Sequence, residues 1–241
     1  MKTPTRNETE RYIVQSKTEE ALGVVTLGLA REDGSVPSFV AGQYINVYFP
    51  ELSTPEGKAY SVSSAPRESL FSITVRAIGE FSNRLSALSP GDAISGSLPY
   101  GFFCADSEES ELVMLAAGIG VAPFRGMLRD MATTSPKRRV HLFHSIRTSS
   151  DAIFRNELDN LRKELPNFSV FYFITRESTS SIPSAQYRRM GATDILSRIT
   201  SLDATEFLIC GSILFTRDMW RALRHGGVNE DRMYTEAFFS H

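Results

Sequence analysis

The pattern of apolar residues changes at a short acidic stretch, residues 105–111, and this change constrains the fold more than any other feature. Before it, β-branched and aromatic residues gather in short runs separated by turn residues, which is typical of compact antiparallel structure. After it, buried-type strands alternate with amphipathic helices, which predicts a parallel, doubly wound sheet. We therefore expect an antiparallel β-barrel over residues 1–106 and an α/β domain over residues 107–241.

The individual elements follow from these two patterns. In the first domain we expect strands at 12–16, 24–30, 43–49, 59–63, 71–77 and 93–97, and one helix at 82–88. In the second domain we expect strands at 112–116, 139–146, 169–175, 206–210 and 233–238, and helices at 124–131, 152–165, 192–199 and 214–225. The helix at 152–165 is predicted from an apolar face made of Ile153, Phe154, Leu158, Leu161 and Leu165.

Composition excludes several classes of protein. A net charge of -2 and a pI near 6.1 argue against a dedicated nucleic-acid binder. The longest nearly apolar run, residues 112–124, is too short to cross a bilayer. The N-terminus lacks the pattern of a secretory signal, so we expect a cytoplasmic protein that does not bind membranes.

Metal-ligating residues are also scarce. Cys104 and Cys210 are too few for an iron–sulfur cluster or the usual structural zinc site. His141 and His144 fall in an apolar stretch, where packing in the core is the expected role. We therefore expect no metal site.

Three segments point to chemistry. Gly118-Ile119-Gly120-Val121-Ala122-Pro123 follows a predicted strand and opens a predicted helix, where glycines and helix amides can admit a phosphate. Alone it also fits a plain turn from strand to helix. Gly79-Glu80-Phe81-Ser82 can hold a pyrophosphate on helix amides, or Ser82 can simply cap the helix that begins there. Lys58-Ala59-Tyr60-Ser61, taken alone, fits any strand with a polar edge.

Together and in this order, the three segments resemble motifs of the ferredoxin–NADP reductase family, flavoproteins with a flavin-binding barrel and a nicotinamide-nucleotide domain. Lys58 to Ser61 resembles the flavin motif Arg-x-Tyr-Ser, and Gly79 to Ser82 resembles the pyrophosphate motif Gly-x-x-Ser. Gly118 to Pro123 is similar to the nucleotide motif GxGxxP, and Cys210-Gly211 to the Cys-Gly pair beside the nicotinamide. The resemblance runs from about residue 12 to residue 239. This chain departs from the family by carrying Lys58 in place of Arg, and Ile119 where many members carry Thr.

The resemblance implies a set of site residues. Those expected at the flavin are Lys58, Tyr60, Ser61, Val62, Val75, Arg76, Gly79, Phe81, Ser82 and, from the tail, Phe238 or Phe239. Those expected at the nicotinamide nucleotide are Gly118, Ile119, Gly120, Ser145, Arg147, Thr175, Arg176, Arg188, Cys210 and Gly211. Catalytic roles fall to Ser61 near flavin N5, Cys210 near the reacting nicotinamide carbon, and Glu236, whose carboxylate can stabilise positive charge on the nicotinamide ring. For Arg76, Cys210 and the two phenylalanines, an ordinary structural role remains an open alternative.

The activity implied is hydride transfer from NADPH to FAD, followed by passage of single electrons to a ferredoxin or flavodoxin. FMN in place of FAD, and NADH in place of NADPH, remain open. NADPH is favoured because Arg176 and Arg188 resemble the residues that hold the 2′-phosphate in the family, although a solvated arginine-rich loop is the alternative. Two other functions also fit the sequence. They are an NADH-dependent reductase component that serves an oxygenase, and a nucleotide-binding regulatory module without turnover.

Overall fold

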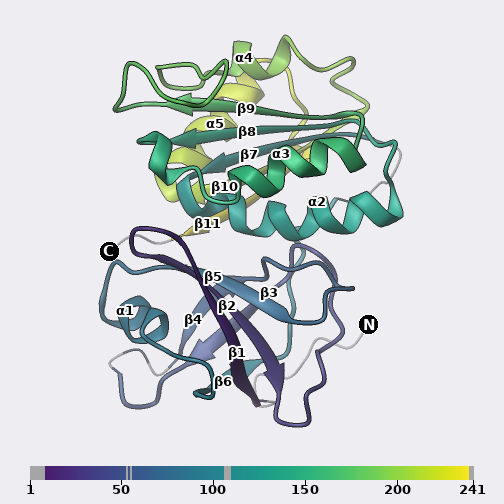
Figure 1. Cartoon of the computed structure of the whole chain (residues 1–241). Coiled ribbons are helices and arrows are strands. Elements are labelled where there is room, and N and C mark those ends of the chain that lie inside the picture. The colour runs from purple at the N-terminus through teal and green to yellow at the C-terminus, as the bar shows by residue number, and fades with distance from the viewer. Residues whose placement is uncertain (1–8, 53, 55, 106–109, 239–241) are drawn as a thin grey trace. The chain divides into compact units, whose positions relative to one another are not determined.

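The computed structural model describes residues 9–52, 54, 56–105 and 110–238 of the chain (Figure 1). These residues divide into two compact units, and the division does not follow the chain in one step. The first unit takes residues up to 102 and also residues 122–130, whereas the second takes residues 103–121 and those from 131 onward. The boundary expected between residues 106 and 107 lies outside the described residues.

The first unit contains a six-stranded antiparallel sheet with the strand order β4-β3-β6-β1-β2-β5. Its strands are β1 (Thr9–Ala21), β2 (Val24–Arg31), β3 (Tyr44–Tyr48), β4 (Lys58–Ser61), β5 (Phe71–Arg76) and β6 (Ala93–Ser97). Directly after β4, Val62 forms an antiparallel bridge with Ile73 of β5. Because β4 and β5 are the two edge strands, this bridge links the edges and the sheet closes like a barrel. The expected antiparallel barrel is confirmed.

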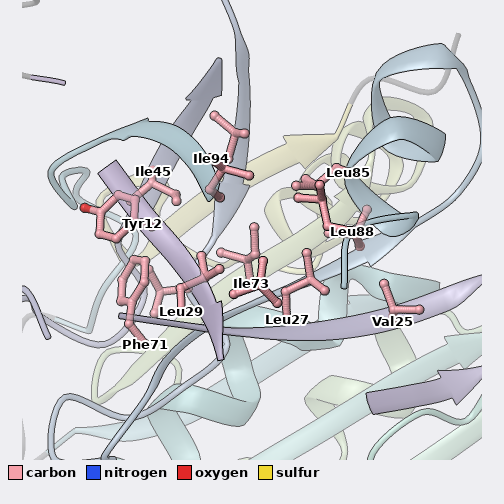
Figure 2. Close-up of a cluster of buried hydrophobic side chains, with 14 of the residues drawn as sticks. Tyr12, Val25, Leu27, Leu29, Ile45, Phe71, Ile73, Leu85, Leu88 and Ile94 are labelled. Carbon is pink, nitrogen blue, oxygen red and sulfur yellow. The ribbon is translucent and has the colours of Figure 1, made fainter. Parts of the chain in front are cut away.

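The core of the first unit is built from alternate residues of these strands, as the two-residue period of a strand requires. Tyr12 and Phe71 stack with their ring centroids 5.6 Å apart, and Phe39 meets Phe71 edge to face at 5.4 Å. Leu27 and Leu29 from β2 are fully buried beside them (Figure 2). Leu85 and Leu88 join the same cluster from α1 (Glu80–Ser86) and the residues after it.

The second unit contains a five-stranded parallel sheet with the order β11-β10-β7-β8-β9. Its strands are β7 (Glu111–Ala117), β8 (Val140–Ile146), β9 (Phe168–Ile174), β10 (Thr205–Ser212) and β11 (Met233–Phe238). Chain order runs outward from β7 in one direction to β9, then in the other direction from β10 to β11. The order therefore reverses between β7 and β10, and the doubly wound sheet expected from the sequence is confirmed.

Helices and short 3₁₀ turns connect the parallel strands. They are η1 (Gly118–Val121), α2 (Ala122–Thr134), η2 (Ser149–Asp151), α3 (Arg155–Glu164), α4 (Ala192–Leu196), α5 (Ile213–His225) and η3 (Glu230–Arg232). Within the described residues, no helix combines the length and apolar character that crossing a membrane requires.

Three predicted helix starts are wrong by two residues or more. The helix expected from residue 124 begins at Ala122. The helix expected from residue 152 begins only at Arg155, because the residues before it form η2 and Phe154 takes a left-handed conformation with φ 60°. Asp151 stabilises this entry by accepting a hydrogen bond from the Thr148 amide at 3.0 Å. The five apolar residues of the predicted face are nevertheless all buried. The helix expected from Ser82 begins two residues earlier, at Glu80, with Gly79 as its N-cap.

We expect Phe71→Ala to lower the free energy of unfolding by about 3–5 kcal/mol, because a fully buried ring is lost from between two aromatic neighbours. Urea denaturation followed by circular dichroism measures the change. Leu22→Ala is the control, since Leu22 is 96% exposed and its truncation should leave the midpoint unchanged. Equal midpoints for the two variants would contradict the described core.

Candidate functional site

Strand β4 and helix α1 together form a small aromatic shelf, which we define as Lys58, Tyr60 and Phe81. Lys58 and Tyr60 share one face of β4 because they are two residues apart. The Tyr60 ring stacks on Phe81 with centroids 6.3 Å apart, and the Lys58 ammonium lies 5.8 Å from the centroid of the Phe81 ring. Burial raises the pKa of the Tyr60 phenol, so this hydroxyl stays protonated at physiological pH. The shelf offers a cation, a neutral hydroxyl and partly exposed aromatic surface in one place.

The remaining residues expected at the flavin differ in their exposure. Ser61 is 5% exposed at the end of β4, and Arg76 is half-buried at the end of β5. Val62 and Val75 are fully buried and belong to the core of the barrel. The structure therefore gives these two valines a place in the core and leaves no exposed atom of theirs for a ligand.

Ser82 lies inside α1 and reaches back to its start. Its Oγ accepts hydrogen bonds from the amides of Ile78 and Gly79 at 3.0 and 3.1 Å, and donates to the Gly79 carbonyl at 3.1 Å. Sequence reasoning correctly assigned Ser82 a capping role but placed it at the beginning of the helix. Gly79 has an extended backbone that any residue can adopt, and a Cβ added there would meet no heavy atom within 4 Å. The space beside this helix start is open, and the fold itself does not require glycine there.

In the second unit, the glycine segments after β7 and at the end of β10 lie against each other. A Cβ on Gly120 would stand 2.3 Å from the carbonyl oxygen of Cys210, and one on Gly211 would stand 2.7 Å from the Cβ of Ala117. These two glycines are required by the close approach of backbones. Gly118 differs, because its left-handed φ of 53° favours glycine while the space around its missing Cβ is open. Ile119 lies between these glycines in η1.

His144 fixes the carbonyl group of Gly118. Its Nε2 lies 2.9 Å from that oxygen, and since a carbonyl can only accept, Nε2 carries the proton and donates. His144 is fully buried at the carboxyl end of β8, so its expected place in the core is confirmed. Its contact with the glycine motif was not predicted. A polar residue near the end of a buried strand beside that motif is the signal that could have revealed it.

Cys210 and Glu236 face each other across two parallel strands. They are paired in register on β10 and β11, where Phe238 is similarly paired with Ser212. Cys210 is fully buried, and this burial, followed by the charge of Glu236, raises the pKa of its thiol well above the ordinary value of 9.0. Cys210 is therefore a neutral thiol and no nucleophile at neutral pH. Phe239, the other aromatic residue expected in the tail, lies outside the described residues.

The carboxyl ends of β8 and β9 bring four of the expected nucleotide residues together. The amide of Thr175 donates to the Ile146 carbonyl at 3.1 Å, and the amide of Arg176 donates to the Arg147 carbonyl at 2.8 Å. These bonds continue the pairing of the two strands, so Ser145, Arg147, Thr175 and Arg176 lie at one edge of the sheet.

Arg188 already has an anionic partner. Its guanidinium forms a two-pronged ion pair with Asp194 and lies 5.4 Å from the centroid of the Phe173 ring. The hydrogen bonds from Arg188 lower the pKa of Asp194. Asp194 also accepts a hydrogen bond from the Gly191 amide at 2.9 Å. A phosphate that binds Arg188 must therefore compete with a carboxylate that the loop holds in place.

Comparisons with known proteins find similarity along nearly the whole chain. Residues 114–221 match the oxidoreductase NAD-binding domain family. A flavohemoprotein of Rhizobium meliloti is 29% identical over 242 residues, which cover 95% of this chain and 60% of that protein. The reductase component of propane 2-monooxygenase from Mycolicibacterium goodii is 28% identical over 239 residues, which cover 96% of this chain and 67% of that protein. This chain thus spans only about 60% of the length of the flavohemoproteins it matches.

Solved structures agree with this fold. The flavohem-like FAD/NAD-binding domain of nitric oxide dioxygenase from Vibrio cholerae superposes with a TM-score of 0.84 at 23% identity, over 95% of this chain and 98% of that one. A ferredoxin NADP⁺ reductase from Neisseria gonorrhoeae, with bound FAD and NADP, superposes with a TM-score of 0.80 at 23% identity, over 96% and 99%.

The parallel sheet and its paired glycine segments lie within the region that matches the oxidoreductase NAD-binding domain family. The two-unit fold is also that of the ferredoxin NADP⁺ reductase structure, in agreement with the resemblance noted in the sequence.

We expect Cys210 to resist alkylation by iodoacetamide in the folded protein, even at a pH close to 9.0, because the raised pKa and complete burial keep the thiolate fraction low. Cys104, which is partly exposed, is the internal comparison. Mass spectrometry of labelled peptides measures both sites, and labelling in denaturant shows that both can react. Rapid native labelling of Cys210 at neutral pH would contradict its described environment.

Proposed function

We propose that this chain binds FAD on its first unit and NADPH on its second, takes hydride from NADPH, and delivers single electrons to a separate ferredoxin or flavodoxin. One observation carries the proposal. The strand order of the parallel sheet reverses between β7 and β10, and the open Gly118 and the Cys210-Gly211 pair lie at the carboxyl ends of these two strands. In open α/β sheets, ligands bind at this reversal.

The residues of the first unit fit a flavin dinucleotide. A flavin ring needs an aromatic or apolar surface. The partly exposed Tyr60 provides one, and its ring is backed by the buried Phe81. A pyrophosphate needs amide donors and room to approach. The space beside Gly79 is open, and because Ser82 already accepts from the amides of Ile78 and Gly79, the donors would be amides of the first turn of α1. Lys58 brings positive charge near α1, because its ammonium lies 5.8 Å from the ring centroid of Phe81 in that helix. As a single ammonium it lacks the two-pronged geometry of an arginine.

Bound FAD supplies the conversion between hydride transfer and single-electron transfer. The chain's own residues bind and orient. Tyr60 would form a wall of the flavin site, and Ser61 would offer a hydroxyl near the reacting flavin nitrogen. In the second unit, Cys210 would line the end of the nicotinamide site, and the carboxylate of Glu236, its partner in strand register, would stabilise positive charge on the nicotinamide ring.

The preference for NADPH rests on the arginines at the carboxyl edge of the sheet. Arg147 and Arg176 are exposed, and their backbones are held side by side by the hydrogen bond from the Arg176 amide to the Arg147 carbonyl. Arg188 can add a further guanidinium if a phosphate displaces Asp194. A 2′-phosphate binds most tightly where such forks converge.

A second candidate is an NADH-dependent reductase component that serves an oxygenase. The observations that favour it are the 28% identity to the propane 2-monooxygenase reductase component and the engagement of Arg188 by Asp194. If the protein uses NADH, Asp194 keeps Arg188 away from any phosphate. No 2′-phosphate site is needed, because NADH carries no 2′-phosphate.

The visible absorption spectrum of the purified protein, reconstituted with FAD and kept without oxygen, tests the proposal. We expect flavin bands that bleach much faster with NADPH than with NADH, followed by reoxidation when oxidised ferredoxin or flavodoxin is added. Bleaching by NADH alone would favour the second candidate. A protein that binds no added FAD would overturn both candidates and leave a nucleotide-binding regulatory module.

We expect Arg176→Ala and Arg188→Ala each to raise the KM for NADPH about tenfold, equivalent to about 1.4 kcal/mol, and to leave the KM for NADH unchanged. Asp194→Asn is the matched contrast, because asparagine still offers an acceptor to the Gly191 amide but no longer binds Arg188 as an anion. This variant should lower the KM for NADPH. Steady-state kinetics with both nucleotides measures all three effects, and equal changes for NADPH and NADH would exclude a 2′-phosphate site.

A further inference from the structure

The four residues after β4, Val62–Ala65, close the barrel, and we call them the closing segment. The amide of Val62 donates to the Gln43 carbonyl at 2.8 Å, next to β3, whereas the amide of Ser63 donates to Ser72 of β5 at 2.8 Å. Between Val62 and Ser63 the chain therefore passes from pairing beside β3 to pairing with β5, the edge strand at the other end of the sheet. Tyr60 and Ser61 immediately precede this crossing, so its placement sets theirs.

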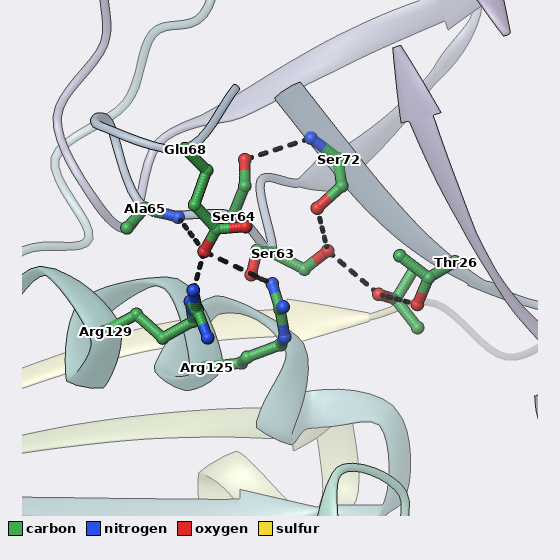
Figure 3. A network of polar contacts seen from close by, with 9 residues as sticks. Thr26, Ser63, Ser64, Ala65, Glu68, Ser72, Arg125 and Arg129 are labelled. Carbon is green, nitrogen blue, oxygen red and sulfur yellow. Dashed lines mark hydrogen bonds and ion pairs between the residues drawn. The ribbon is translucent and has the colours of Figure 1, made fainter. Parts of the chain in front are cut away.

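Arg125 of α2 holds the closing segment. Residues 122–130 of α2, which include Arg125, belong to the first unit. Arg125 Nη1 donates a hydrogen bond to the Ser63 carbonyl at 2.7 Å, and the Arg125 side chain is only 14% exposed (Figure 3). A charged donor on a backbone carbonyl makes one of the stronger hydrogen bonds found in proteins.

Gly126 gives independent evidence that α2 is pressed against the closing segment. A Cβ on Gly126 would stand 2.5 Å from the Ser64 carbonyl oxygen and 3.1 Å from its carbon. Even a methyl group would push the helix away, because the obstacle is backbone. The absence of a side chain at residue 126 thus brings Arg125 within reach of Ser63.

Glu68 extends the same contact to the next turn. Its Oε1 accepts a hydrogen bond from the Ala65 amide at 3.1 Å and forms ion pairs with Arg129 and Arg125, the latter at 3.7 Å. The last residue of the closing segment is therefore anchored through Glu68 to two arginines of α2.

A chain of hydroxyl groups holds the segment from within the barrel. Ser63 Oγ accepts from Thr74 Oγ1 at 2.9 Å and lies 3.1 Å from Ser72 Oγ, and Thr74 Oγ1 lies 3.0 Å from Thr26 Oγ1. Ser64 Oγ accepts from the Ser72 amide at 3.0 Å. Ser63 and Ser64 are fully buried. Inside the barrel the segment is thus fixed by hydroxyls, and at the carbonyls of Ser63 and Ser64 it is fixed by Arg125 and Gly126.

We propose that Arg125, seated by Gly126, is a positioning residue for the flavin site: it holds the closing segment and through it the two flavin-contacting residues Tyr60 and Ser61. The inference rests on the proposed function, because it concerns how FAD is held. It assigns no contact between Arg125 and the flavin. The inference predicts that a side chain of α2, the helix that follows the nucleotide motif, controls the affinity of the protein for FAD.

Titration of the apo-protein with FAD, followed by the loss of flavin fluorescence, tests the proposal. We expect Arg125→Met to weaken FAD binding about tenfold. Arg125→Lys retains one charged donor and should recover part of this loss. At saturating FAD, the visible circular dichroism of the bound flavin should differ in Arg125→Met and return toward wild type in Arg125→Lys. Gly126→Ala should weaken FAD binding in the same way, without removing any hydrogen-bonding group.

The matched control is Arg11→Met, which removes an arginine of the same unit that pairs with Glu32 at 3.0 Å while both side chains are about 60% exposed. It should leave FAD affinity and the flavin spectrum unchanged. Thermal unfolding of each apo-protein shows whether a variant is folded. If wild type binds FAD and folded Arg125→Met and Gly126→Ala bind it equally well with the same dichroism, the positioning role is overturned while the proposed function stands. If wild type binds no FAD, both fail.

Discussion

The backbone of η1 rests directly on the carbonyl of Cys210, and the arrangement of the second unit depends on this contact. The 2.3 Å that would separate a Cβ on Gly120 from that oxygen leaves no room for any side chain. The loop after β7 and the end of β10 are consequently held together where the strand order reverses. Gly118 is then presented beside Cys210, whose strand partner is Glu236. One backbone contact thus holds the glycine segment to the end of β10, and the strand register adds Glu236 beside Cys210.

Much of the fold was predictable because local patterns agreed with the tertiary structure. The strands at 93–97 and 233–238 match the prediction. A turn of Pro90, Gly91 and Asp92 marks the start of the first, and the second carries Tyr234 and Phe238. Strand β1 extends to Ala21, beyond its predicted end at Ser16. The prediction missed this second half because it is polar and largely exposed and shows no alternation of apolar residues. The start of α3 was missed for a different reason. Phe154 is apolar at helical spacing but reaches the core through a left-handed backbone, which no side-chain pattern reveals.

The site was predictable as a set of motifs but not as a set of contacts. The spacing of the glycines pointed to Gly118 and Gly120 equally. In the structure, Gly120 is packed against the backbone of Cys210, whereas the space beside Gly118 is open. Arg188 was expected to be available for a phosphate, whereas it binds Asp194, six residues away across a loop. The bond between Arg125 and Ser63 joins residues 62 positions apart. Such long-range pairs depend on how the chain returns to itself, and nothing in the neighbouring sequence encodes them.

The division of the chain between the two units has a consequence for how the protein can be taken apart. Residues 122–130 belong to the same unit as the barrel. In the chain, however, they follow β7 and precede β8, which are both strands of the parallel sheet. The strands of the barrel are continuous in the chain, but the first unit as a whole is not, and no single cut yields it whole. A fragment that ends near residue 106 lacks the two arginines and the glycine that hold its closing segment, and exchange of barrels between related reductases must transfer the start of α2 as well.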